Sequence, residues 1–226
     1  SVEPDSTHFR DGGAESPVVT TVPTFEVDLA VGIDHGAKPG KQIAVLLAIW
    51  RDRPSRPWRV HVVDEYTDRT GRPTPRDDAE GILAMLARNG ITWADLAFAG
   101  GDKVHEPGTA QQKSNRDLTV HVAAELERIG QKRVGDELFP PIRTIKRGQG
   151  RGAGSVGVRS RWLYHRTCEP GGFQVHRRCK RVIGALNRYD LRDTEWKDPI
   201  DAIVYGLDPW IFGPGAPERG VDLVLG

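Results

Sequence analysis

Four acidic residues stand where carboxylates often carry out chemistry in α/β proteins. Asp34 ends the apolar segment FEVDLAVGID, and Asp102 ends the segment DLAFAGGD. Asp198 and Asp201 are three residues apart at the start of the last predicted helix, so both carboxylates can share one helix face. Because open α/β sheets bind ligands beyond the carboxyl ends of their strands, we expect Asp34 and Asp102 to meet there.

Carboxylates gathered in this way favour a divalent cation, because they repel one another until a positive charge lies between them. Hard oxygen ligands select Mg²⁺ or Mn²⁺. Two such ions about 4 Å apart can activate a water and stabilise the leaving oxygen of a phosphodiester. Gly100 and Gly101, which lack side chains, are expected to leave room for a ligand beside Asp102. Taken singly, each acid could instead be a strand-end or helix-capping residue.

The hydrophobic pattern predicts the strands that hold these residues. Three strands at 25–34, 42–51 and 58–67 are joined by short loops, which is typical of an antiparallel meander. Strands at 95–102 and 141–146 follow, and the first is entered from a helix and so runs parallel to residues 25–34. We therefore predict an α/β fold with a central mixed five-stranded sheet, three antiparallel strands and then two parallel ones.

Helices are predicted on both sides of these strands. The sequence TPRD at 74–77 combines an N-cap residue with proline at the first helical position, and Asn89-Gly90 closes that helix. Apolar periodicity predicts further helices at residues 118–129, 158–165, 177–189 and 198–210. A short strand is expected within EPGGFQVH at 169–176.

The domain organisation follows from composition along the chain. Residues 1–24 are rich in Ser, Thr, Pro and Gly and are predicted to be a linker or the edge of an expressed fragment. Residues 25–212 are predicted to form one domain, and residues 213–226 a loop-like tail.

The overall composition indicates a globular protein. The chain has 226 residues, 38% hydrophobic and 28% charged, which excludes disordered and fibrous classes. The longest apolar run, Ile43–Trp50, is far shorter than the roughly 20 residues of a membrane helix. No leader opens the chain and two cysteines make no disulfide scaffold, so we expect a protein of a reducing compartment that is not secreted.

A net charge of only +1 hides a strong asymmetry. Residues 143–188 hold twelve basic residues and one acid, so their net charge is +11 and that of the remainder is −10. This segregation predicts a surface for a polyanion beside an acidic centre, although a solvated basic face without a partner is the alternative. The candidate nucleic-acid contacts are Lys146, Arg147, Arg151, Arg159, Arg161, Arg177 and Arg178.

Several other polar residues are weaker candidates. Asp64 and Glu65 end the third predicted strand and could add a carboxylate, but we expect a solvated strand end. His35 and His105 each follow a metal candidate closely and could tune a bound water, yet loop positions are the simpler expectation. Lys103 could hold a scissile phosphate or offset local charge.

Two motifs of other classes fit poorly. His165, Cys168, His176 and Cys179 have the spacing H-x₂-C…H-x₂-C of a zinc site, but they flank different elements, and buried structural cysteines are the favoured reading. The segment GAKPGK at 36–41 is not a phosphate-binding loop, because only three residues separate its glycines and Gln42 replaces the required Ser/Thr.

Three segments together resemble a known family. VGIDHG at 31–36, AGGD at 99–102 and KDPIDAIVYGL at 197–207 look like the acidic motifs of the nuclease domain of tailed-phage terminase large subunits. FQVHRRCKRVIGALNRYD at 173–190 is similar to the segment that precedes the last motif in that family. The resemblance covers roughly residues 27–210 and implies an RNase H-like fold.

The resemblance implies a function and a set of partners. Asp34, Asp102 and Asp201 would bind two Mg²⁺ or Mn²⁺ ions, with Asp198 as a further ligand; the match of DA-x-x-Y to Asp201, Ala202 and Tyr205 favours Asp201 over Asp198. The chain would cut concatemeric double-stranded viral DNA with little sequence specificity. An ATPase domain of the same full-length protein, the portal and the small terminase subunit would be its partners, in the host cytoplasm and transiently at the procapsid.

Two alternatives stay open at this stage. Another RNase H-like nuclease, such as a Holliday-junction resolvase or a transposase core, would share part of the motifs. A DNA-binding module that has lost catalysis would keep the basic stretch but would not depend on Asp34.

Overall fold

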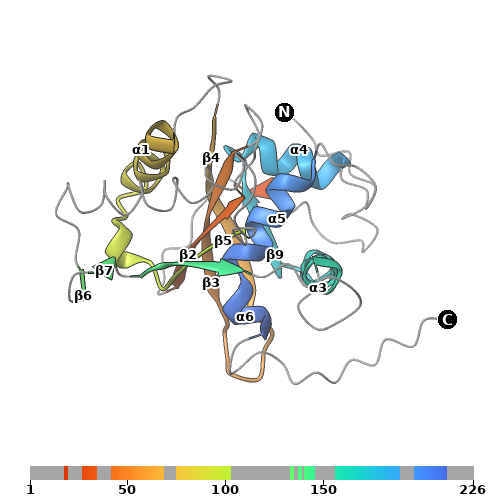
Figure 1. The fold of residues 1–226 in the computed structure, drawn as a ribbon. Coiled ribbons are helices and arrows are strands. Elements are labelled where there is room, and N and C mark those ends of the chain that lie inside the picture. The colour runs from red at the N-terminus through yellow and green to blue at the C-terminus, as the bar shows by residue number, and fades with distance from the viewer. Residues whose placement is uncertain are drawn as a thin grey trace.

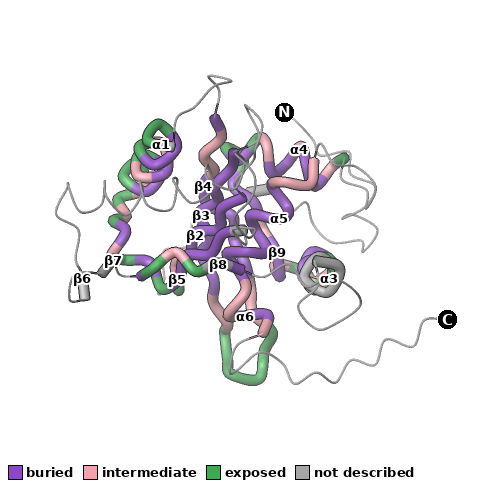
Figure 2. Tube along the Cα trace, in the orientation of Figure 1, coloured by how far each residue is buried: buried purple, intermediate pink, exposed green. Residues whose placement is uncertain are grey.

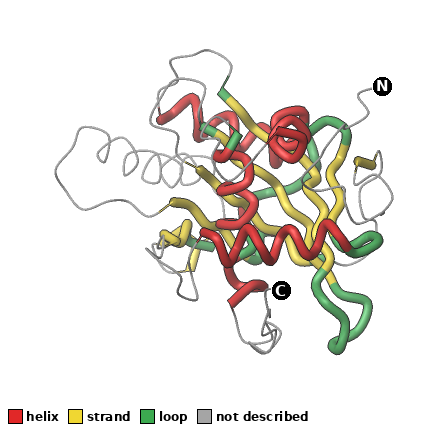
Figure 3. The backbone as a smooth tube through the Cα atoms, turned by 90° about the vertical axis from the view of Figure 1, so that its right-hand side faces the viewer, coloured by secondary structure: helices red, strands yellow, loops and turns green. Residues whose placement is uncertain are grey.

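A mixed β-sheet with helices on both faces forms the centre of the molecule (Figure 1). The computed structural model describes residues 18–19, 27–34, 42–68, 75–102, 133–134, 137–138, 140–145, 156–188 and 196–212. In Figure 3, turned by 90°, the strands form one twisted layer and several helices lie in front of it.

The central strands have the predicted arrangement. Strands β2 (Asp28–Asp34), β3 (Ile43–Trp50) and β4 (Arg59–Thr67) form the antiparallel meander. Strand β5 (Phe98–Asp102) lies parallel to β2 on its other side, and β8 (Ile142–Ile145) lies parallel to β5. This order of three antiparallel and two parallel strands confirms the predicted α/β fold with an RNase H-like sheet.

The strand count differs from the prediction. Strand β9 (Phe173–His176) pairs in parallel with β4, and β1 (Val18–Val19) pairs in parallel with β9. In the described part of the chain the sheet therefore has seven strands, in the order β1-β9-β4-β3-β2-β5-β8, rather than five. The segment predicted as a linker over residues 1–24 contains one of them. A separate two-stranded ladder joins β6 (Arg133–Val134) to β7 (Glu137–Leu138).

Helices divide between the two faces of the sheet (Figure 1). Helix α1 (Pro75–Ala87) packs on one face, and the turn that follows it closes at Gly90, whose φ of +70° is the left-handed conformation expected of a glycine after a helix. A short 3₁₀ turn at Trp93–Asp95 leads into β5. Among the described residues, four helices pack on the other face: α3 (Val156–Cys168), α4 (Lys180–Arg188), α5 (Lys197–Gly206) and α6 (Asp208–Phe212).

The last predicted helix is two helices. Helix α5 ends at Gly206 and α6 begins at Asp208. The sequence pattern did not reveal this break at Leu207, because the apolar periodicity over 198–210 continues through it. The helix predicted at 118–129 lies outside the described residues. None of the helices in the described ranges is long and apolar enough to cross a membrane.

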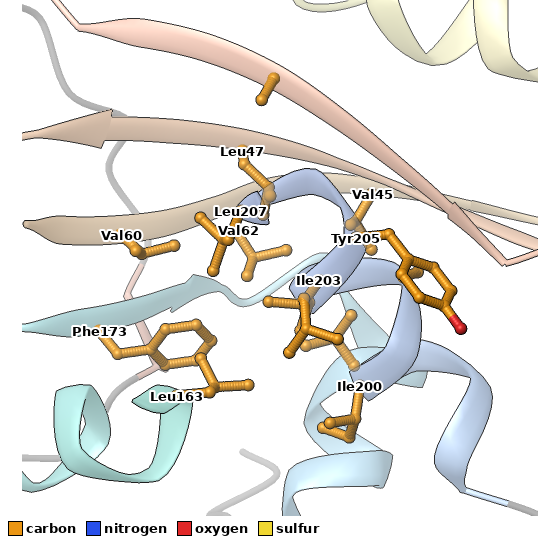
Figure 4. Close-up of a cluster of buried hydrophobic side chains, with 14 of the residues drawn as sticks. Val45, Leu47, Val60, Val62, Leu163, Phe173, Ile200, Ile203, Tyr205 and Leu207 are labelled. Carbon is orange, nitrogen blue, oxygen red and sulfur yellow. The ribbon is translucent and has the colours of Figure 1, made fainter. Parts of the chain in front are cut away.

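Two apolar layers fill the space on either side of the sheet. Figure 4 shows the layer beneath α5, where Ile203 and Leu207 meet Leu47 and Val62. The second layer packs α1 against the opposite side of the same strands. Strand β3 is buried on both faces, so residues 43–49 form a continuous apolar run instead of an alternating one (Figure 2).

Glycines allow α5 to lie directly on the backbone of two strands. A Cβ atom on Gly32 of β2 would overlap the carbonyl oxygen of Ala202, and one on Gly100 of β5 would lie 2.5 Å from the carbonyl oxygen of Tyr205. The helix contributes Gly206, whose own Cβ would lie 2.9 Å from the Gly32 nitrogen. The space beside Gly100 that the sequence suggested for a ligand is thus filled by α5, and that expectation was wrong.

Replacing Gly32 tests this contact. We expect Gly32→Ala to lower the free energy of unfolding by about 3 kcal/mol, because the obstructing atoms belong to the helix backbone and cannot rotate away. Gly90→Ala is the matched control, since no atom lies within 4 Å of its added methyl. Its positive φ alone should cost about 1 kcal/mol. Equal losses in urea denaturation would show that α5 can shift away from β2 at little cost.

Candidate metal and nucleic-acid site

Asp34 and Asp102 end two neighbouring parallel strands. The β2–β5 register pairs Ile33 with Gly101, so the next residue of each strand is the aspartate. Asp102 is paired on its other side with Ile145 of β8. The structure therefore places both aspartates in the same row at the carboxyl edge of the sheet, and the side chain of Asp102 lies outside the described part of the chain.

Asp34 is on the face of the sheet that α5 covers. Side chains alternate along a strand, and both Ala30 and Gly32 face α5 and its apolar layer. Asp34 is two residues beyond Gly32, so its side chain lies on the same face, and it is only 4% exposed. The Asp34 carboxylate is therefore almost fully withdrawn from solvent at the end of β2.

Helix α5 brings Asp201 to the same end of the sheet. The indole N–H of Trp210, in α6, donates to Asp28 Oδ2 at the start of β2 (3.2 Å), while Ala202 contacts Gly32 further along that strand. The α5–α6 segment therefore runs antiparallel to β2. The residue before Ala202, Asp201, accordingly lies toward Asp34 and the end of β2.

Asp201 is fully buried and carries a counter-charge. Its side chain is 1% exposed, and Lys197 Nζ lies 3.1 Å from its Oδ2 atom. Asp198, one turn earlier in α5, is partly exposed, and the N-cap residue of the helix is Trp196, which makes no side-chain cap hydrogen bond. Asp198 is therefore not the N-cap residue, which was its simplest structural role.

These donors suit a hard divalent cation. Two buried carboxylates, Asp34 and Asp201, supply oxygen ligands of the kind that Mg²⁺ and Mn²⁺ prefer. Within the described side chains, which leave out that of Asp102, no group of three or more His, Cys, Asp or Glu residues is gathered as for a metal ion. The fit thus rests on two placed carboxylates and the backbone position of a third.

Similar architecture is found in large terminases of phages. The nuclease domain of the P22 large terminase is similar over 84% of this chain and 84% of its own, with a TM-score of 0.52 and 16% identity. The large terminase of a thermophilic bacteriophage, solved in complex with ADP, has a TM-score of 0.52 and 15% identity over 87% of this chain. This chain has the fold of a large-terminase nuclease domain.

The remaining similarities are partial or weaker. The chain spans only 42% of the thermophilic phage protein. The nuclease domain of the SPP1 large terminase, solved with bound Mn, has a TM-score of 0.46 and 15% identity over 84% of this chain and 94% of its own. No protein-family model and no curated protein sequence matches this chain.

Asp64 is not a solvated strand end, contrary to expectation. It is 2% exposed and accepts two hydrogen bonds from Arg88, Nε to Oδ2 at 2.6 Å and Nη2 to Oδ1 at 2.9 Å. Asn89 and the Glu65 N–H donate to it as well, at 2.7 and 2.9 Å. Burial alone would raise the pKa of Asp64, but these donors hold it below its ordinary value of 3.8. Asp64 joins β4 to the end of α1.

Glu65 also has a structural role. Its Oε1 accepts the backbone N–H of Arg181 at 2.7 Å, and its Oε2 accepts that of Val182 at 2.9 Å. Both donors belong to the first turn of α4, where backbone N–H groups lack helical partners and the helix dipole favours a negative charge. Burial raises the pKa of Glu65, and the two N–H bonds partly offset that rise. Glu65 therefore caps α4 from the neighbouring strand.

The sequence reasoning missed another carboxylate group, on the α1 face. Asp78 of α1 is 6% exposed and accepts a hydrogen bond from the Tyr66 hydroxyl at 2.8 Å. Burial raises the pKa of Asp78 to about 6, with further contributions from Asp68 and Asp77. This group faces away from α5, so it is separate from the metal candidates.

The cysteine and histidine motif does not form a zinc site. His165 is exposed on α3, whereas His176 is buried on β9 and accepts a hydrogen bond from Arg178 Nε at 2.9 Å. Cys179 is buried, its thiol lies 3.6 Å from the Val62 carbonyl oxygen, and burial raises its pKa. All four side chains are described, and they are not gathered around a common point.

The predicted nucleic-acid contacts are partly described. Arg161 and Arg177 are exposed, and for Arg159 only the backbone within α3 is described. Arg178 is exposed, but its guanidinium also contacts Asn89 and lies 3.7 Å from Asp64. The other three predicted nucleic-acid contacts, Lys146, Arg147 and Arg151, lie outside the described residues. So do His35, His105 and Lys103, the weaker candidates beside the predicted metal ligands.

A cationic cluster that the sequence pattern did not reveal lies beside α5. The guanidinium groups of Arg181 and Arg188, both on α4, lie 4.5 and 4.9 Å from the ring centre of Trp196. Trp196 immediately precedes α5 and packs against Gly184, which has no side chain to obstruct it. Cation–π contacts of this kind hold arginines in place, so fixed positive charge stands next to the start of the metal-candidate helix.

Asp64→Asn separates structural from metal-binding carboxylates. We expect it to lower the free energy of unfolding by about 3 kcal/mol at pH 7, because Arg88 loses a buried charged partner. Since the pKa of Asp64 is depressed, this stabilisation is present above pH 3.8 and is lost as the pH falls through the folded value. Urea denaturation measures the loss, and Mn²⁺ titration should show unchanged affinity. Loss of Mn²⁺ binding in a folded variant would place Asp64 in the metal site.

Proposed function

We propose that this chain is the nuclease domain of a DNA-packaging terminase large subunit and a metal-dependent endodeoxyribonuclease, with residues 25–212 as the domain. One observation supports the proposal: α5 crosses β2 antiparallel and in backbone contact, and Asp201 directly precedes Ala202, whose carbonyl oxygen lies against Gly32. The fold shared with the P22 nuclease domain supports it.

Each acidic residue has a distinct role in this proposal. Asp34, at the end of the central strand, would help to hold both cations, while Asp102 would help to hold one and Asp201 the other. Asp198, partly exposed one turn before Asp201, is a further ligand. When bound, two Mg²⁺ or Mn²⁺ ions lower the pKa of a water and offset the charge of the leaving oxygen. The carboxylates would hold the cations and position a water for in-line attack on phosphorus; that attack would break the P–O3′ bond and leave a 3′-hydroxyl and a 5′-phosphate.

The substrate is double-stranded DNA bound through its backbone. Phosphate contacts give affinity without reading base sequence, which fits cutting of concatemeric viral DNA with little sequence specificity. We assign these contacts to exposed arginines of α3 and of the turn before α4, including Arg161 and Arg177, together with the Gly/Arg-rich stretch that contains Lys146, Arg147 and Arg151.

The wider setting belongs to the same proposal. A terminase large subunit would supply an ATPase domain in the same full-length protein, and the portal and the small terminase subunit would be its other partners. The site of action would be the host cytoplasm, transiently at the procapsid portal. The thermophilic phage large terminase, solved with ADP and covered for 42% of its length by this chain, is the observation that favours a longer protein.

A plasmid-nicking assay tests the activity. We expect Mg²⁺- or Mn²⁺-dependent cutting of plain supercoiled and linear DNA, and none in EDTA. Asp34→Ala and Asp201→Ala should each lose more than about 100-fold in rate, beyond the 10–100-fold typical of outer-shell changes around a metal. Asp52→Ala, an exposed carboxylate in the β3–β4 hairpin, is the matched control and should cut normally.

Other outcomes favour the other classes. Fourfold or greater preference for branched over linear DNA would indicate a junction resolvase. DNA binding without cutting under every metal, unchanged in Asp34→Ala, would contradict the nuclease and indicate a binding module.

A further inference from the structure

Lys197 is placed against the buried carboxylate of α5. Its Nζ atom lies 3.1 Å from Asp201 Oδ2, with the lysine side chain 31% exposed and the aspartate side chain 1% exposed. The two residues are four apart in the helix, so one turn of α5 sets their separation. The partly exposed ammonium side chain therefore lies against a carboxylate that is almost fully withdrawn from solvent.

Helix stability does not explain this pair. Lys197 is the first residue of α5, where the helix dipole disfavours a positive charge. A lysine that precedes an acid by four residues is also the less stabilising order of such a pair. The buried carboxylate explains it better, because an ionised group withdrawn from water needs a compensating charge.

We propose that Lys197 is the built-in counter-ion of the metal-free site and that a divalent ion competes with its ammonium group for Asp201. This inference rests on the proposed function, in which Asp201 is a metal ligand. Without metal, Lys197 keeps the buried carboxylate compensated and the start of α5 in place. When metal binds, the flexible lysine stem carries the ammonium group away from Asp201 to solvent. Because the metal must displace this ammonium group, Lys197 sets the metal affinity of the site.

The exchange predicts opposite effects in the two states. Removing the positive charge should destabilise the metal-free protein and tighten metal binding. A lysine that only stabilised the fold would lower stability equally with and without metal and would leave the affinity unchanged. The two measurements together therefore separate a counter-ion from a simple structural residue.

The test uses the full chain with Lys197→Gln, Lys197→Arg and the control Lys180→Gln, which removes an exposed positive charge from α4. Mn²⁺ affinity is measured by electron paramagnetic resonance of free Mn²⁺, and the melting temperature by circular dichroism in EDTA and in saturating Mn²⁺. For Lys197→Gln we expect a lower melting temperature in EDTA, a larger rise on adding Mn²⁺, and about tenfold tighter binding, similar to the effect of a neighbouring charge on proton affinity. Lys197→Arg and Lys180→Gln should bind Mn²⁺ like the wild type.

The outcomes separate failure of the counter-ion role of Lys197 from failure of the proposed metal site. If wild-type protein binds Mn²⁺ and Asp34→Asn abolishes that binding, but Lys197→Gln binds with unchanged affinity, the counter-ion role is wrong and the metal site stands. If the wild type binds no Mn²⁺, or binds it equally well in Asp34→Asn, the proposed metal centre is wrong and the counter-ion role falls with it.

Discussion

Backbone contact between α5 and the sheet is the constraint on which the proposed site depends. A helix that packs through side chains usually lies 8–10 Å from a neighbouring helix axis, and a sheet layer has a similar spacing. Here Gly32, Gly100 and Gly206 remove the side chains that would hold the layers apart. Because the helix sits on the strand backbone, a short aspartate side chain on α5 can approach one at the end of β2.

The carboxylates near this end of the sheet differ in the groups that contact them. Asp64 and Glu65 are saturated by donors from α1 and α4, and they fix how those helices meet β4. Asp201, by contrast, has the ammonium group of Lys197 3.1 Å from its Oδ2 atom, on a lysine side chain that is 31% exposed. A carboxylate held by a rigid network is a structural element, whereas one held by an exchangeable charge is suited to binding a cation.

The sequence predicted those features that local patterns determine. The meander, the parallel placement of β5 and the turn after α1 that closes at Gly90 all follow from apolar runs, turn residues and connection rules. The pairing of β9 with β4 was missed, because a four-residue strand gives no signal of its distant partner. Glu65 was misread for the same reason: the helix that it caps lies 116 residues further along the chain.

The candidate site shows the same division between local and distant information. Strand ends located Asp34 and Asp102, and helical spacing located Asp198 and Asp201, all from short segments of sequence. The role of Gly100 was misjudged, because its contact with Tyr205 depends on how α5 crosses the sheet. The arginines around Trp196 were overlooked as a cluster, since their arrangement depends on the packing of α4 against the start of α5.

We propose that α5 places Asp201 in a metal site at the ends of β2 and β5. Anomalous diffraction from crystals grown with Mn²⁺ would locate such a site. We expect Mn²⁺ peaks about 2 Å from carboxylate oxygens of Asp34, Asp102 and Asp201 together, with Lys197 Nζ displaced from Asp201. A peak coordinated by Asp34 and Asp102 while Asp201 stays paired with Lys197, or no peak at this edge of the sheet, would contradict it.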